Sequence, residues 1–423
     1  MKINVQVIKS IAGSTFFKLS SAFVSFFVVP LLLRALGSNQ YAIWVTLTSM
    51  IVWISLFDFG SGYSLKNKVG ETITEEDRSD LQVLIAGTIQ FYLLTTVLLM
   101  FVFLGSIFFV KVFRQELALT FYIYLPIIFA FPLTLGNFIL QGVKKFNAIS
   151  IVQFAQVFIW LLLVLLFRYD VITVSLRKLA ISYSLLYFLS NLLLFVLSMR
   201  NVDFEWKKIF ELSHFRSSKK SLLVGLRFFI LQISSLVLYS LGNVLVYNHM
   251  SLTNVAQYDT VNKFFLITMT IFNVVISVFW TEISQAKAQK SKEKLMKLFN
   301  QLLLISLGFC CIIICASFLM PIVISLWTKR QIEVHVGQMY SFALLDCIKT
   351  FAYAGAVVLN AFENLTGQII LSIIASLLMV PLATFLFNQG VGIGTVPLAS
   401  ALLTFPTMVY VLFKAKKSIK HLH

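Results

Sequence analysis

Four basic side chains lie within long apolar segments of the sequence, where a charged group is costly: Lys18, Arg227, Lys263 and Lys349. On insertion scales a lysine or arginine at the centre of a bilayer costs about 2.5–3.5 kcal/mol, so it needs compensation there. Ammonium and guanidinium groups form charge-assisted hydrogen bonds with phosphate oxygens. We therefore predict that these four residues line a polar cavity and bind an anionic substrate. The alternative is that their long side chains extend along the helices to the lipid head groups.

Three aspartates accompany these cations. Asp259 precedes Lys263 by four residues, and Asp346 precedes Lys349 by three. Side chains at these spacings meet on one face of a helix. The two aspartates can therefore neutralise the neighbouring lysines or carry a coupling ion, H+ or Na+, and the sequence leaves both roles open. Asp58, at the end of another apolar segment, is either a helix cap or a further acidic group of the cavity.

No pattern in the sequence is typical of an enzyme, a metal site or a bound cofactor. The chain contains no Walker A motif and no nucleophile beside a general base. Its five histidines and four cysteines lack metal-ligand spacing. We therefore predict no catalytic residue, no metal and no cofactor, apart from a coupling ion.

Hydrophobic residues dominate the composition. They make up 59% of the 423 residues, and charged residues only 12%, against about 25% in average soluble proteins. A membrane-spanning helix requires about 20 mostly apolar residues. We predict an all-α polytopic membrane protein with twelve transmembrane helices. The expected spans are 11–34, 40–58, 81–109, 119–141, 148–167, 179–199, 222–247, 257–281, 298–320, 339–361, 366–388 and 391–413.

The distribution of basic residues predicts the orientation. The net charge is +17, and most Lys and Arg lie in short gaps at alternate ends of the spans and in the tail after 413. Because cations accumulate in cytoplasmic loops, both termini are predicted to be cytoplasmic. The sequence has no separate basic domain of the kind that would indicate nucleic-acid binding. The polar stretch 200–221 is either an amphipathic surface helix or a solvated linker, and it divides an N-terminal bundle of six helices, 1–199, from a C-terminal one, 222–423.

Two short segments of the first half are each similar to a segment of the second half, and the separation along the sequence is nearly the same for both pairs. Residues 13–17 are similar to 225–229, and 41–44 to 255–258. Six spans per half return the chain to its starting side, so the halves are predicted to be parallel repeats related by a pseudo-two-fold axis along the membrane normal. Transporters built in this way bind their substrate between the halves.

Several motifs resemble those of one transporter family. They are Leu36–Trp44, Phe57–Gly60, Leu65–Val69, Ile139–Lys145, Phe279–Ala286 and Leu326–Trp327. Together they are similar to motifs of the Wzx-type O-antigen flippases, in the polysaccharide transporter branch of the MATE-like MOP superfamily. The resemblance implies two six-helix bundles around a cationic cavity, with Lys18 and Arg227 closest to the family's intramembrane cations.

The resemblance also implies a function. Family members export undecaprenyl-pyrophosphate-linked oligosaccharides, such as O-antigen units, across the bacterial inner membrane by alternating access, driven by an ion gradient. The implied partners are this lipid-linked substrate, membrane lipids and a polysaccharide polymerase complex.

Three other functions are considered. A MATE-like ion-coupled antiporter of drugs or organic cations would call for net-acidic residues in the cavity, whereas cations outnumber anions within the spans. A membrane glycosyltransferase or polymerase would require a large outer loop or an acidic catalytic pair, and neither is visible. A scaffold without transport activity is the third alternative.

Overall fold

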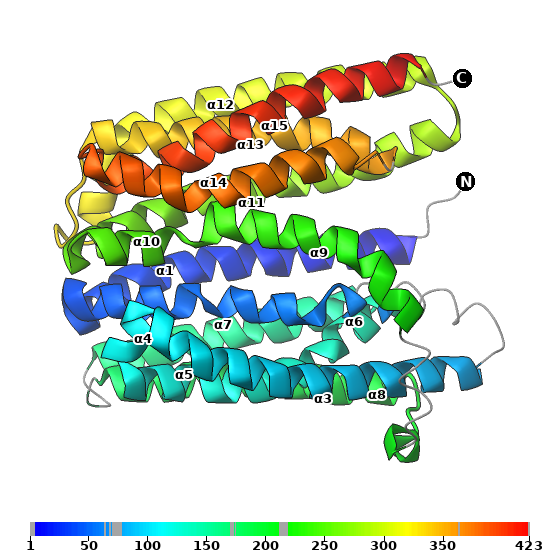
Figure 1. The fold of residues 1–423 in the computed structure, drawn as a ribbon, viewed down its shortest axis with the longest axis horizontal. Coiled ribbons are helices and arrows are strands. Elements are labelled where there is room, and N and C mark those ends of the chain that lie inside the picture. The colour runs from blue at the N-terminus through cyan, green and yellow to red at the C-terminus, as the bar shows by residue number, and fades with distance from the viewer. Residues whose placement is uncertain are drawn as a thin grey trace. The chain divides into compact units, whose positions relative to one another are not determined.

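The computed structural model describes residues 5–62, 65–66, 69, 78–169, 173, 175–210, 219–362 and 364–421. Within these ranges every regular element is a helix (Figure 1). The chain divides into two compact units, Met1–Gln232 and Ile233–His423. The boundary falls inside a continuous helix, α9 (Lys219–Ser240). The predicted division into 1–199 and 222–423, and the repeat that relates the halves, stay predictions.

The N-terminal unit contains long helices joined by short ones. Before α9 it consists of α1 (Val5–Ser49), η1 (Ile51–Asp58), α3 (Arg78–Phe109), α4 (Lys111–Gln115), α5 (Leu117–Ala130), η2 (Phe131–Thr134), α6 (Leu135–Gly142), α7 (Phe146–Arg168), α8 (Leu176–Asn201) and η3 (Trp206–Phe210). An aromatic cluster joins three of these helices. Trp44 of α1 stacks on Trp160 of α7, and Tyr183 of α8 packs edge-on against both.

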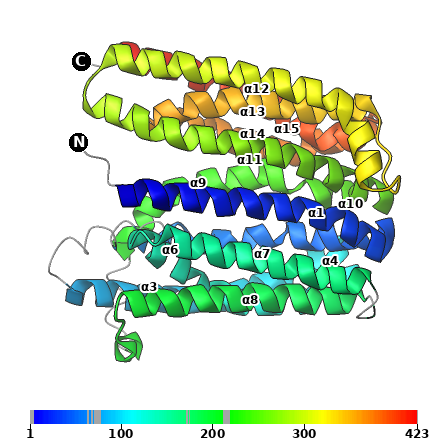
Figure 2. The same ribbon diagram turned by 180° about the vertical axis from the view of Figure 1, so that it is seen from behind.

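The C-terminal unit contains the end of α9 followed by five long helices and two short elements. They are α10 (Gly242–His249), α11 (Leu252–Ala288), α12 (Lys292–Trp327), α13 (Val336–Ala361), α14 (Thr366–Asn388), η5 (Gly392–Gly394) and α15 (Thr395–Lys420). Helix α13 is the central one, because it packs against α11, α12 and α15, and α11 and α12 lie beside it in Figure 2.

The first two predicted spans, 11–34 and 40–58, are joined at a single residue. Gly37 has φ 73° and ψ 167°, and helical backbone continues on both sides of it within α1. A positive φ is strained for residues with a Cβ but accessible to glycine. The expected connecting loop is therefore one residue long.

Proline interrupts another predicted span. The segment expected at 119–141 forms α5 and α6, separated by the 3-10 turn η2, in which Pro132 stands near the start. Proline has no amide hydrogen and cannot donate the hydrogen bond of an α-helix interior. The span changes from α-helix to a 3-10 turn at Pro132, whereas α5 continues past Pro126.

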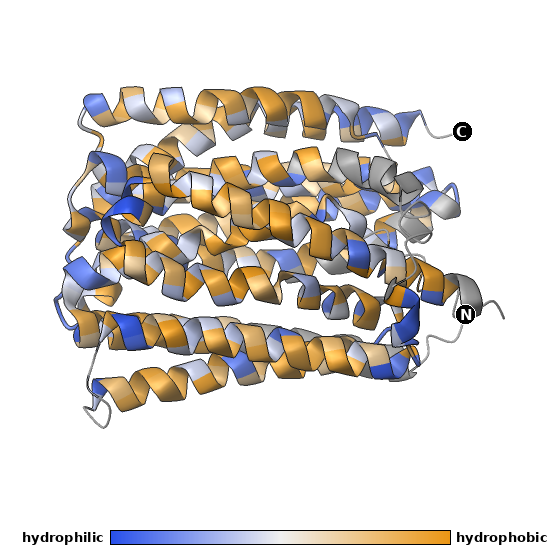
Figure 3. Cartoon of the chain, turned by 60° about the horizontal axis from the view of Figure 1, so that its bottom comes forward, coloured by the Kyte–Doolittle hydropathy of each residue, from blue (hydrophilic) through white to orange (hydrophobic). Residues whose placement is uncertain are grey.

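Among the described residues, nine helical segments are long and apolar enough to cross a membrane. The first, Ser20–Asp58, covers most of the predicted span 11–34 and all of 40–58. The predicted spans 222–247 and 257–281 correspond to α9, α10 and α11. These three helices are not among the nine segments. Exposed apolar side chains such as Phe101 and Leu304 are typical of surfaces that face lipid. Hydrophobic residues predominate along the long helices (Figure 3). The prediction of an all-α polytopic membrane protein is confirmed, whereas the count of twelve stays a prediction.

The start of the predicted linker 200–221 is bound to α3. The side-chain amide of Gln82 donates to the carbonyls of Val202 and Asp203, and its oxygen accepts the amide hydrogen of Glu205. The side-chain amide of Gln90 donates to the carbonyl of Ile209. Residues 211–218 lie outside the described part, so the choice between surface helix and linker stays open for them.

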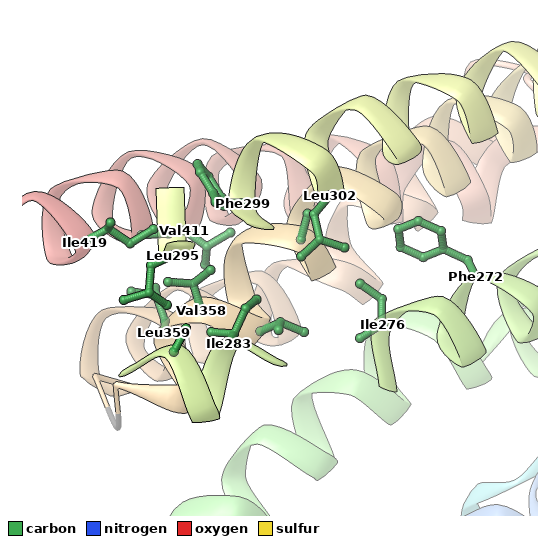
Figure 4. Close-up of a cluster of buried hydrophobic side chains, with 14 of the residues drawn as sticks. Phe272, Ile276, Ile283, Leu295, Phe299, Leu302, Val358, Leu359, Val411 and Ile419 are labelled. Carbon is green, nitrogen blue, oxygen red and sulfur yellow. The ribbon is translucent and has the colours of Figure 1, made fainter. Parts of the chain in front are cut away.

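A cluster of buried apolar side chains holds the helices of the C-terminal unit together. It includes Phe272 of α11, Leu302 of α12, Val358 of α13 and Val411 of α15 (Figure 4). Helices α13 and α15 approach closely, because a Cβ atom at Gly355 would lie only 2.8 Å from the backbone carbon of Val411. This packing fixes the orientation of α13, the helix that carries Asp346 and Lys349.

Candidate functional site

The lysine and aspartate of α13 form a buried ion pair. Lys349 is 8% exposed and Asp346 is 3% exposed. The Nζ atom of Lys349 donates to Oδ1 of Asp346 at 3.2 Å. The i,i+3 spacing brings the two groups together, as expected from the sequence. Because Lys349 is buried near the middle of α13, its side chain does not extend to the end of the helix.

An aromatic ring from α9 provides a second contact for Lys349. Its Nζ atom lies 4.9 Å from the ring centroid of Tyr239. A cation over an aromatic face gains about 2 kcal/mol when both groups are shielded from water. The Tyr239 hydroxyl is 3.1 Å from the hydroxyl oxygen of Thr404, in α15. Three helices of the C-terminal unit thus contribute to this lysine site.

One oxygen of Asp346 has no hydrogen-bond partner within the described part of the chain. This atom, Oδ2, is buried, whereas Oδ1 accepts the bond from Lys349. A buried acceptor left without a partner costs about 1–3 kcal/mol, and more when it is charged. The site therefore presents a buried carboxylate oxygen that a proton or a small cation would stabilise.

A second ion pair lies on α11. The Nζ atom of Lys263 is 2.6 Å from Oδ2 of Asp259, and the side chains are 33% and 6% exposed, respectively. The side-chain amide of Asn243, in α10, donates to Oδ1 of Asp259 at 3.0 Å. Asp259 is thus held by two helices, whereas Lys263 remains partly exposed. Both predicted Asp–Lys pairs form, so each of these lysines has its charge balanced in this structure.

Asp58 belongs to the N-terminal unit and stabilises a tight turn. It ends η1 and is 4% exposed. Its Oδ1 atom accepts the backbone amide hydrogen of Gly60 at 2.8 Å, where Phe59 and Gly60 both have positive φ. An aspartate that accepts a bond from the amide two residues ahead forms an Asx-turn. The bond stabilises the turn that follows η1, and the choice between a helix cap and an acidic group of the cavity stays open.

For the remaining two predicted cations, the structure describes only the helix on which each residue lies. Lys18 lies on α1 and Arg227 on α9, but both side chains are outside the described part of the structure. Their role as substrate-binding residues stays a prediction. So does the same role for Lys263 and Lys349, whose contacts are described above.

Two partners of these charges, Tyr239 and Asn243, could not be assigned from the sequence, nor could Thr404, the partner of Tyr239. Tyr239 and Asn243 belong to a polar row of the seventh predicted span, 222–247, but nothing there indicates which charge each contacts. Thr404 lies in an apolar segment of α15 without any signal. Each contact joins two different helices, whereas the sequence shows only the periodicity within one helix. Among the described residues, no group of three His, Cys, Asp or Glu could hold a metal ion.

Comparison with solved structures shows the fold. A multidrug resistance MATE family transporter of the MOP superfamily, in an inward-facing conformation, has a TM-score of 0.75 and 15% identity over 97% of this chain and 95% of that chain. The chain has the MOP transporter fold. A second MOP superfamily transporter, from Pyrococcus furiosus, has a TM-score of 0.59 at 14% identity, covering 99% of this chain and 94% of that one. That transporter has a binding pocket of reverse polarity, which suggests a different function for it.

Curated proteins similar in sequence to this MOP-fold chain are O-antigen transporters by name. A Salmonella typhimurium protein proposed to be an O-antigen transporter is 22% identical over 438 residues, 97% of each chain. A Yersinia pseudotuberculosis protein proposed to export O-antigen is 38% identical over 52 residues, 12% of each chain. No protein-family model matches the chain. The predicted resemblance to the O-antigen transporters of the MOP superfamily is confirmed, and the proteins to which the chain is similar are named as transporters.

Proposed function

We propose that this protein is a flippase that translocates an oligosaccharide linked to undecaprenyl pyrophosphate, such as an O-antigen unit, across the bacterial inner membrane. This proposal rests on the burial of the cationic side chain of Lys349. A lysine placed within a span, at the cost of its desolvation, is suited to an anionic substrate and unsuited to a cationic one. The similarity to proteins named as O-antigen transporters supports the same class of substrate.

The ion pair of α13 suggests how substrate binding is coupled to an ion. A diphosphate has two charged groups that compete with Asp346 for the ammonium group of Lys349. When the diphosphate displaces this carboxylate, Asp346 loses its cation in a poorly solvated position and takes up H+ or Na+. Lys263 holds further phosphate charge, and Asp259 balances this lysine when no substrate is bound. In the N-terminal unit, Lys18 and Arg227 as substrate-binding cations and Asp58 as a charge-balancing group stay predictions. The polyprenyl chain stays in the lipid during alternating access.

The proposal includes an orientation and partners. The N- and C-termini lie in the cytoplasm, because the tail that follows the last span is rich in lysine. The sugar enters from that side and leaves on the periplasmic side. There a polysaccharide polymerase complex receives it. Labelling of single cysteines at either end of the chain in intact cells tests this orientation.

A second candidate function is an ion-coupled antiporter of drugs or organic cations. The observation that favours it is the likeness of the fold to a multidrug resistance transporter. An organic cation would pair with Asp346 or Asp259 after either aspartate released its lysine. Ethidium efflux from cells expressing the chain separates this function from the flippase, which is expected to leave efflux unchanged.

The test of the flippase proposal removes the charge of Lys349 without leaving its partner charged. The double variant Lys349→Met with Asp346→Asn is expressed in a strain that lacks its own copy of the gene. We expect normal amounts of protein in the membrane, at least tenfold less surface polysaccharide, and accumulation of the lipid-linked oligosaccharide. The matched control is Lys416→Met, at an exposed position of α15. Surface polymer at the wild-type level in the double variant would overturn the role assigned to Lys349.

A further inference from the structure

A hollow of about 1010 Å³ lies on the surface of the C-terminal unit, along α12 and beside the end of α15. Its charged lining consists of Lys292, Lys297, Lys420 and one acid, Glu293. This hollow is separate from the two ion pairs within the unit, and the proposed translocation does not use it.

The lining changes from polar to apolar along one face of α12. Lysines line the hollow near the start of the helix, amide side chains follow, and Leu304 lies at the other end. Leu304 is 70% exposed, and the partly buried Met296 contributes further apolar surface. At about 1.5 Å per residue, the hollow extends about 18 Å along the helix from Lys292. Its two ends therefore favour different parts of an amphipathic ligand.

The length of α12 places this change in polarity at the membrane boundary. The helix has 36 residues and is about 54 Å long at 1.5 Å per residue, whereas the hydrocarbon core is about 30 Å thick. At least one end must therefore extend into the head-group region. The first ten residues of α12, 292–301, contain its charged and amide groups, and the apolar run begins at Leu302.

The lysines of the hollow are available for an external anion. Among the described residues, Lys292, Lys297 and Lys420 form no ion pair within 4.0 Å. In contrast, Lys294 on the same helix contacts Glu282 of α11 at 3.4 Å. A cluster of lysines close to the membrane surface attracts anionic lipid head groups.

We propose that this hollow binds an anionic phospholipid of the membrane. The three lysines contact the phosphate of the head group, and Met296 and Leu304 contact the first part of an acyl chain. The bound lipid joins the start of α12 to the end of α15, because Lys420 contributes from the second helix. This site is independent of the proposed transport substrate.

The test compares two triple variants that remove the same charge. Lys292→Gln, Lys297→Gln and Lys420→Gln change the hollow, whereas Lys414→Gln, Lys416→Gln and Lys417→Gln change lysines of α15 that do not line it. Each full-length protein is purified, checked for folding by thermal unfolding, and titrated with phosphatidylglycerol or phosphatidylcholine in native mass spectrometry. We expect wild type and control to bind phosphatidylglycerol at least tenfold more tightly than phosphatidylcholine, and the hollow variant to lose this preference.

Two other outcomes would overturn the proposal. An equal loss of phosphatidylglycerol in both triple variants would show diffuse attraction to the basic end of the unit. Complete displacement of the lipid by 10 mM inorganic phosphate would assign the hollow to a soluble anion, because the acyl contact would then contribute nothing.

Discussion

Lys349 lies over the ring of Tyr239, with its Nζ atom 4.9 Å from the ring centroid, while it donates to Asp346 on its own helix. The ammonium group of Lys349 thus contacts both a carboxylate and an aromatic face. An ammonium group held in this way can exchange its carboxylate for a phosphate without losing all its contacts. This arrangement is therefore compatible with a cation that binds and releases an anionic ligand.

Replacing the ring of Tyr239 should weaken the site more than removing its hydroxyl. Tyr239→Phe keeps the aromatic face and loses only the contact with Thr404, so we expect a loss of stability of about 1 kcal/mol or less. Tyr239→Leu loses the face and should cost about 2 kcal/mol or more. Denaturation of the purified variants in detergent measures the difference. Equal losses in both variants would show that the ring does not stabilise Lys349.

The charges of Asp346 and Lys349 should be strongly coupled. Removal of one partner from a buried pair leaves the other uncompensated and typically costs about 3–5 kcal/mol. We expect Asp346→Asn and Lys349→Met each to lower stability by about that amount, and the double variant to be more stable than either single variant. A double-mutant cycle on thermal or denaturant unfolding measures this coupling. Additive losses would contradict it.

The pair on α11 should be less sensitive to the loss of its cation. Lys263 is 33% exposed, and Asp259 retains the hydrogen bond from Asn243 when the lysine is removed. Lys263→Ala should therefore cost about 1 kcal/mol, clearly less than Lys349→Met. The same unfolding assay compares the two, and a larger loss at Lys263 would reverse the order of burial seen in the structure.

A methyl group at Gly355 should separate α13 from α15. The added Cβ would lie 2.8 Å from the backbone of Val411, where no flexible side chain can move aside. We expect Gly355→Ala to destabilise the C-terminal unit by about 1–3 kcal/mol through overpacking. Gly308→Ala on α12 is the matched control, because a Cβ there meets nothing within 4 Å. Gly308→Ala should be neutral or slightly stabilising, and a similar loss in both variants would contradict the packing argument.

Hydropathy predicted the fold class because each long apolar segment carries its own signal. It did not predict that the connection expected at residues 35–39 is reduced to Gly37, since hydropathy does not show that a single glycine can join two helices. The motifs that led to the family resemblance are partly packing motifs. Tyr41 and Trp44 are buried in the N-terminal unit, and Ile283 belongs to the apolar cluster of the C-terminal one.

The two Asp–Lys pairs were predictable because both partners lie on one helix. The contacts of Tyr239, Thr404 and Asn243 join different helices, and no pattern within a single segment identifies them. Sequence periodicity shows which residues share a face, but the neighbour of that face depends on how the helices pack.

The junction at Gly37 has a mechanical consequence. With one non-helical residue between the first two spans, the link has no spare length. A change in the tilt of one span relative to the other must therefore be taken up by the two backbone dihedrals of Gly37, or by unwinding of a helical turn beside it. Inserting a few flexible residues here would uncouple the two spans while leaving their lipid-facing surfaces intact.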